Sequence, residues 1–110
     1  MGLPVIITPQ AQEDLRRIVT HVAKDSRERA LALGNRLIDR ALKVGSFPGA
    51  GRMVTEEQDP TIREVIQESY RIIYEVLSDP PQVYVLRFWH AARGLAEIRE
   101  SGEGGAAGDP

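Results

Sequence analysis

The sequence predicts a two-layer α+β domain in which one strand, two helices and three further strands follow one another along the chain. Apolar residues recur every three or four positions over residues 9–44, a spacing typical of amphipathic helices. After residue 61 the spacing changes to two, which is typical of strands. The apolar face of a helix pair must be buried against another element, and one face of a sheet can bury it.

The first strand and helix are expected over residues 3–24. Residues 3–8 (LPVIIT) are rich in β-branched side chains and predict a short strand. Thr8 is the expected N-cap and Pro9 the first helical residue, where a missing N–H costs nothing. One apolar face is then made by Ala11, Leu15, Ile18 and Val22, and the polar residues that fall outside it are Glu13, Asp14, Arg16 and Arg17.

A second helix is expected to begin at Asp25, with Glu28 completing a capping box. Its apolar face is formed by Ala30, Leu33, Leu37, Ala41 and Val44. Gly45 and Pro48 predict its end. Because only about two residues join the helices, they are predicted to form an antiparallel hairpin.

The second half of the chain predicts a three-stranded antiparallel meander. Residues 48–61 are expected to form a loop, and strands follow at 62–67, 70–77 and 83–89. Residues 78–81 (SDPP) predict a turn. The residues 91–100 suggest a short terminal helix weakened by Gly94, so the predicted order is β-α-α-β-β-β.

Length and composition predict one domain over residues 1–100 and a disordered Gly/Ala-rich tail over 101–110. The absence of cysteine excludes disulfides, zinc ribbons and thiol catalysis. No apolar run is long enough to span a membrane and no signal peptide is recognisable, so no membrane partner is expected. The usual nucleotide, hydrolase and metal motifs are absent, so no cofactor or metal is expected.

The charge distribution is uneven. Residues 1–55 carry nine basic and five acidic residues, whereas residues 56–110 carry five basic and eleven acidic ones. Twelve of the 14 cations are arginine, which forms bidentate contacts with carboxylate and phosphate. The basic half either contacts an acidic or phosphate-bearing partner or is simply a solvated helix surface.

His90 and Arg71 are the candidate catalytic residues. His90 ends the last predicted strand, where a rigidly held imidazole can transfer a proton near neutral pH. Arg71 interrupts an apolar strand and must be exposed or paired. His90 also has a structural explanation, since it can cover the sheet edge. The other histidine, His21, lies in the first helix and is expected to lie at the surface or in packing.

Arginines on the predicted strands suggest a basic sheet face. Alternation places Arg71, Ile73 and Glu75 on one face, and Arg63 and Arg87 lie in the neighbouring strands. Such a face binds phosphate or an acidic peptide. The alternative is pairing within the sheet, with the carboxylates of Glu64, Glu68 and Glu75.

Several segments, in order and at consistent spacing, resemble the RelE/ParE superfamily of bacterial type II toxin–antitoxin toxins. They are Thr8-Pro9-Gln10-Ala11-x-x-Asp14-Leu15, Pro48-x-x-Gly51-Arg52, Arg63-Glu64, YRIIYEV from Tyr70, and VLRFWHAAR from Val85 to Arg93. The resemblance covers about residues 4–95 and implies the same β-α-α-β-β-β order.

The resemblance implies a small cytoplasmic toxin, as in plasmid stabilisation modules. A cognate antitoxin neutralises it through an acidic segment that is partly disordered until it binds. RelE-like members cleave mRNA on the ribosome; in that branch Arg71 and His90 would be catalytic. ParE-like members inhibit DNA gyrase without being nucleases. No Lys follows Lys43 and no Tyr follows Tyr84, which departs from the RelE pattern. The regular helical hairpin and the His90-x-x-Arg93 ending are more similar to the ParE-like branch. Target or antitoxin contacts are then expected at Arg52, Arg63, Arg71, Arg87, His90 and Arg93.

Overall fold

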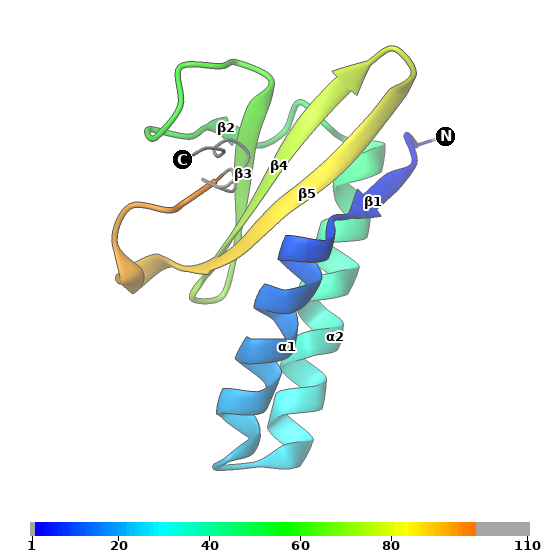
Figure 1. The fold of residues 1–110 in the computed structure, drawn as a ribbon. Coiled ribbons are helices and arrows are strands. Elements are labelled where there is room, and N and C mark those ends of the chain that lie inside the picture. The colour runs from blue at the N-terminus through cyan, green and yellow to red at the C-terminus, as the bar shows by residue number, and fades with distance from the viewer. Residues whose placement is uncertain (1, 99–110) are drawn as a thin grey trace.

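The structure is a computed structural model in which residues 2–98 are described; the predicted tail, 101–110, lies outside them. The predicted order of strand, helical pair and three long strands is confirmed (Figure 1). The elements are β1 (Val5–Ile7), α1 (Pro9–Ala23), α2 (Arg27–Lys43), the 3-10 turn η1 (Val44–Ser46), β2 (Arg52–Met53), β3 (Ile62–Gln67), β4 (Tyr70–Ser78), β5 (Pro81–His90) and the 3-10 turn η2 (Ala91–Arg93).

The helix boundaries follow from their caps. The Thr8 side chain accepts a hydrogen bond from the Ala11 N–H and donates one to the Val85 carbonyl, so it also ties α1 to β5. The N-cap of α2 is Ser26, whose hydroxyl accepts from the Arg29 N–H at 3.2 Å. The prediction of Asp25 as the cap was wrong by one residue, because the side chain that accepts from the first turn of α2 is Ser26, while the Asp25 N–H and the Ser26 N–H both still bond to the Val22 carbonyl near the end of α1.

The sheet has five strands in the order β1-β5-β4-β3-β2. The predicted antiparallel meander is β3-β4-β5. β1 extends it by pairing in parallel with β5, and β2 pairs with β3 on the other side. The prediction that residues 48–61 form only a loop was therefore wrong; β2 has two residues, too few to produce a recognisable alternation.

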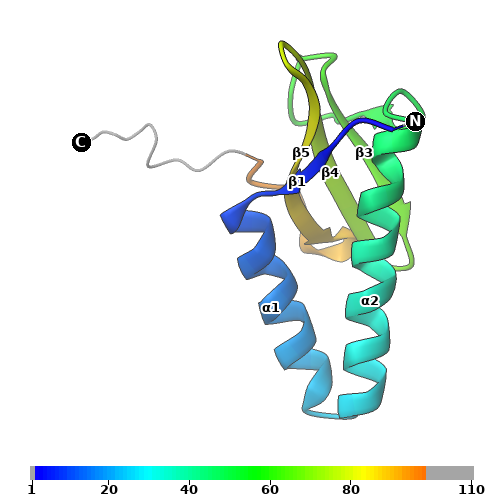
Figure 2. The same ribbon diagram turned by 90° about the vertical axis from the view of Figure 1, so that its right-hand side faces the viewer.

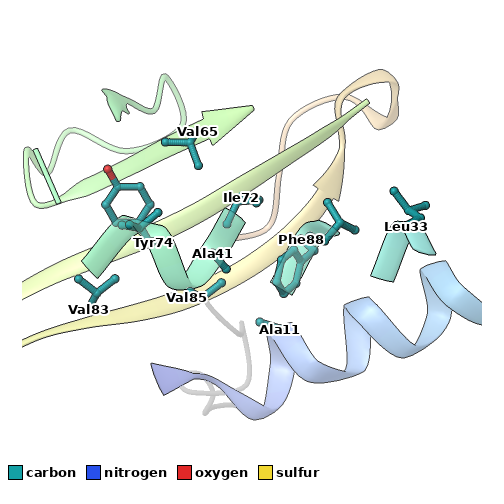
Figure 3. Packing of buried hydrophobic residues seen from close by; sticks show 11 residues of the cluster. Ala11, Leu33, Ala41, Val65, Ile72, Tyr74, Val83, Val85 and Phe88 are labelled. Carbon is teal, nitrogen blue, oxygen red and sulfur yellow. The ribbon is translucent and has the colours of Figure 1, made fainter. Parts of the chain in front are cut away.

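The two helices run antiparallel and cover one face of the sheet (Figure 2). Both helices contribute buried side chains to this first core, among them Ala11 and Leu37. Figure 3 shows how the strand residues meet them: Val65, Ile72, Tyr74, Val83, Val85 and Phe88 project from the sheet toward the helices. At the middle of the hairpin Gly34 lets the helices approach closely, because a Cβ there would lie 3.0 Å from Val19.

The opposite face of the sheet carries a second, smaller core. Its buried members are Val54, Ile62, Ile73, Trp89 and Ile98. The chain reaches this face after β5, since Gly94 adopts a positive φ of 93° and the Trp89 indole N–H donates to the Gly94 carbonyl. The predicted terminal helix over 91–100 is limited to the 3-10 turn Ala91–Arg93, and residues 94–98 form an irregular segment over the sheet.

A β-bulge in β5 changes which residues face which core. Ile73 pairs with Arg87 and Tyr74 pairs with Val85, so Leu86 is the extra residue. Leu86 packs against the second core, and Phe88 instead of Arg87 faces the helices. Because of the bulge, the Arg87 side chain does not enter the core between the sheet and the helices, although the residues on either side of it in β5 pack into the two cores.

Candidate functional site

Arg71 lies on the sheet face opposite the helices and is tied to two carboxylates. Its guanidinium donates two hydrogen bonds to Glu56, at 2.6 and 2.8 Å, and a third to Glu64. All three side chains are largely buried, with exposed fractions of 12% for Arg71, 7% for Glu56 and 4% for Glu64. The alternative of pairing within the sheet is therefore what the structure adopts for Arg71 and Glu64.

The ion pair determines the protonation of Glu56. The hydrogen bonds from Arg71, and a further one from the Ala96 N–H, lower the pKa of Glu56 to about 2 against the opposing effect of burial. The two carboxylates in turn raise the pKa of Arg71. Because Ala96 belongs to the segment that covers the second core, the Glu56 carboxylate joins three parts of the chain: β4, the loop after β2 and residues 94–98.

Arg52 lies at the rim of this network, on β2. Its Nε donates to Glu64 at 2.7 Å, while 71% of its side chain is exposed. A shallow cavity of about 370 Å³ opens beside it and is lined by Arg52, Met53, Thr55, Glu64, Ile66, Arg71 and Ala91. Because the buried acids balance the arginines here, the cavity carries no excess of positive charge with which to hold a phosphate.

Arg63 and Arg87 lie elsewhere. Arg63 alternates with Val65, on the face toward the helices, and donates to the Gly51 carbonyl at 2.8 Å. Arg87 forms a buried bidentate pair with Asp14 of α1, with N–O distances of 2.7 and 2.9 Å. It also donates to the carbonyl of Glu97.

Asp14 serves a second purpose at the sheet edge. Beyond β1 the N–H groups of β5 have no partner strand, and Asp14 accepts a hydrogen bond from the Phe88 N–H at 3.1 Å. Its carboxylate thus satisfies an edge donor and an arginine together. The prediction that Asp14 falls outside the buried face of α1 was wrong, since only 5% of the residue is exposed.

His90 and Arg93 lie on the helix side, at the end of β5. The His90 Nδ1 accepts from the Ala92 N–H at 3.1 Å, and its ring meets Tyr70 edge to face with centroids 5.1 Å apart. The Arg93 guanidinium lies 3.8 Å from the centre of the Trp89 ring. Both residues line a cavity of about 200 Å³ together with Asp14, Arg17, Ile18, His21, Tyr70 and Phe88.

The structure therefore separates the predicted site residues. Arg71 and Arg52 belong to the face opposite the helices, and His90 and Arg93 line the cavity on the helix side. Arg87 lies at the sheet edge beside Asp14, and Arg63 lies on the helix side next to Gly51. The two candidate catalytic residues, Arg71 and His90, are on opposite faces of one sheet. A base, an acid and a cation for a scissile phosphate need to converge on one point, and this pair does not.

Two residues that sequence reasoning missed are Glu56, in the loop, and His21, on α1. Nothing in the residues around Glu56 signals that it meets β4, because the contact depends on how the loop folds. His21 had a usable signal: Asp14, Ile18 and His21 are spaced by four and three residues, which places them on one side of a helix. All three line the cavity that contains His90.

Among residues 2–98, no cluster of three or more histidine, aspartate or glutamate side chains is arranged to hold a metal ion. In the same range, no helix combines the length and apolar character needed to cross a membrane.

The chain is similar to known proteins. Residues 5–95 match the model of a family described as the ParE toxin of the type II toxin-antitoxin system, parDE. A structure of the chromosomal ParDE system from P. aeruginosa is similar with a TM-score of 0.67, at 21% identity, over 81% of this chain and 96% of that one.

The structure of the RelBE2 toxin-antitoxin complex from Mycobacterium tuberculosis is similar with a TM-score of 0.57, at 18% identity, over 82% of this chain and 99% of that one. At these identities the two structures show a common fold. A comparison with curated proteins found no match.

Proposed function

Because this chain belongs to the ParE toxin family of type II toxin–antitoxin systems, we propose that it inhibits DNA gyrase by binding it, without catalysing a reaction, and that a cognate antitoxin blocks this activity. The proposal that the protein acts without catalysis is supported by the position of Arg71 and His90 on opposite faces of the sheet. We place the protein in the cytoplasm, where gyrase acts, and assign the activity to a domain of residues 1–100.

The six arginine and histidine candidates take different roles in this proposal. Arg52, His90 and Arg93 are exposed and are the proposed contacts with gyrase or antitoxin. The others, Arg63, Arg71 and Arg87, are engaged by backbone carbonyls or carboxylates, so they hold the contact surface in place.

The antitoxin is proposed to bind with an acidic segment that folds on the toxin. The helical hairpin offers a basic surface for it, because α2 exposes basic residues at both of its ends, Arg27 and Arg29 at the start and Lys43 at the end. Charge complementarity of this kind accelerates association and selects the partner.

Pulse labelling of DNA, RNA and protein synthesis after induction of the chain alone in bacteria tests the proposal. We expect DNA synthesis to fall first, and purified protein to inhibit supercoiling by gyrase. The matched variants are Arg93→Ala and Arg16→Ala, both at exposed arginines, of which only Arg93 lies in the proposed contact surface. An early fall in protein synthesis would instead identify the RelE-like activity, cleavage of mRNA on the ribosome. Growth unaffected by induction of folded protein would reject both.

A further inference from the structure

The cavity on the helix side of the sheet is distinct from the Arg71 network. It has a volume of about 200 Å³ and is lined by residues of α1, the start of β4, the end of β5 and the turn η2. Tyr70 and Phe88 come from the strands, while Arg17 and His21 come from α1. The cavity therefore joins α1 to strands and a turn that lie far along the chain from it.

The charges around this cavity are unbalanced. Two guanidinium groups, Arg17 and Arg93, and two imidazoles, His21 and His90, line it. Asp14 is the acid in the lining, and both of its oxygens are already occupied by Arg87, which lies outside the lining. With neutral histidines the cavity thus retains a formal charge of about +2 from its two arginines.

Two of the hydrogen-bond donors in this cavity, Arg93 and His90, are held in place by contacts within the protein. The Arg93 guanidinium stacks on Trp89 and forms no ion pair with any residue of 2–98. His90 is fixed on both sides, by the Ala92 N–H at Nδ1 and by the edge of Tyr70. A neutral His90 consequently carries its proton on Nε2, where it is a donor. Little side-chain freedom is lost when such donors bind a ligand.

The Arg17 guanidinium is exposed and contacts Glu13. Its Nε contacts Glu13 at 3.1 Å, and 69% of the side chain is exposed. No hydrogen bond of its two terminal nitrogens is found among the described residues, so both remain available for a ligand. The exposed pair with Glu13 contributes little energy and is readily exchanged for a stronger one.

We infer that this cavity binds the dianion of a phosphate monoester through Arg17, Arg93 and His90. A phosphate group offers three terminal oxygens to these donors, and its charge of about −2 matches that of the two arginines. A single carboxylate would leave one guanidinium without a partner. The walls formed by Ile18, Phe88 and the Tyr70 ring are apolar and leave room for the organic part of a small ester. The inference does not depend on gyrase being the target.

Titration of the purified 110-residue chain with inorganic phosphate at constant ionic strength tests the inference, with calorimetry and the imidazole NMR signals as readouts. We expect the signals of both His21 and His90 to shift. Arg17→Gln and Arg93→Gln should each weaken binding about tenfold, the loss expected for one charge-assisted hydrogen bond. The matched control is Arg16→Gln, because Arg16 also contacts Glu13 and is similarly exposed but does not line this cavity.

Two further ligands identify the source of the phosphate. Binding of adenosine monophosphate tighter than that of inorganic phosphate, with no binding of adenosine, would indicate a nucleotide; equal binding would indicate the free ion, and either supports a phosphate site. Three results would overturn the inference: no shift of the histidine signals at millimolar phosphate, equal weakening by Arg16→Gln, or binding of succinate as tight as that of phosphate. Folding of each variant is checked by its unfolding transition in the same buffer.

Discussion

Arg71 pairs with Trp89 across strands β4 and β5, whereas His90 pairs with Tyr70, the residue before Arg71. Partners in an antiparallel pair share a face and neighbours along a strand do not. Arg71 and His90 therefore lie on opposite sides of the sheet although each is only one position away from the other's partner. As a consequence, the two side chains cannot both contact one small ligand.

The separation predicts that Arg71 and His90 act independently. Arg71→Ala leaves the buried Glu56 without its cation and Glu64 with Arg52 alone, and we expect it to lower the free energy of unfolding by about 3–5 kcal/mol. His90→Ala removes an exposed ring and should cost less than about 1 kcal/mol. The double variant, measured by urea denaturation, should show the sum of the two losses within about 0.5 kcal/mol. A larger coupling energy would mean that the two residues share a network.

The buried pair of Asp14 with Arg87 predicts a large effect from a single helix residue. Asp14→Ala removes the partner of Arg87 and the acceptor for the Phe88 N–H, so we expect a loss of about 3–5 kcal/mol of unfolding free energy. The neighbouring Glu13→Ala, which breaks only exposed pairs with Arg16 and Arg17, should cost less than about 1 kcal/mol. Similar losses for the two variants would contradict the edge-capping role of Asp14.

The lowered pKa of Glu56 predicts acid sensitivity. Because its folded-state pKa is about 2 and its ordinary value is 4.5, the ionised pair contributes full stability above pH 4.5 and loses it as the pH falls toward 2. The contribution is up to about 3 kcal/mol. Glu56→Gln should therefore flatten the dependence of unfolding free energy on pH in that window.

Glu68 provides the control for this measurement. Its pKa is also lowered to about 2, by Arg36 and Gln67, but 38% of its side chain is exposed and solvent screens the pair. Glu68→Gln should change the pH dependence less than Glu56→Gln does. The assignment to Glu56 fails if Glu68→Gln flattens the curve as much.

Gly51 is predicted to be irreplaceable because it lies against a buried tyrosine. A Cβ at this position would lie 2.3 Å from the Tyr74 hydroxyl and 2.7 Å from the Glu64 carbonyl. Gly51→Ala also disturbs the hydrogen bond from the Gly51 N–H to that hydroxyl, and we expect it to lower the thermal midpoint with a loss of about 1–3 kcal/mol. Gly49→Ala is the control, since a Cβ there meets nothing within 4 Å, and it should leave the midpoint unchanged or raise it.

Most of the fold of this protein follows from local sequence patterns. The helix spacing, the Thr8-Pro9 start and the change of period after residue 61 depend on local geometry, which neighbouring residues specify. The same holds for the order of the long strands. The segments that resemble the RelE/ParE superfamily also lie in the sequence, and the family match over residues 5–95 confirmed that resemblance.

The use of the charged side chains, by contrast, depends on packing between distant segments. The bulge at Leu86 reorients Arg87, the loop brings Glu56 to Arg71, and α1 brings His21 to the cavity that His90 also lines. Alternation along one strand indicates which residues share a face, but it does not indicate which residue of another segment contacts them. The energy of a buried charge depends on that partner, and for this reason the roles of Arg71, Arg87 and Asp14 became visible only with the packed molecule.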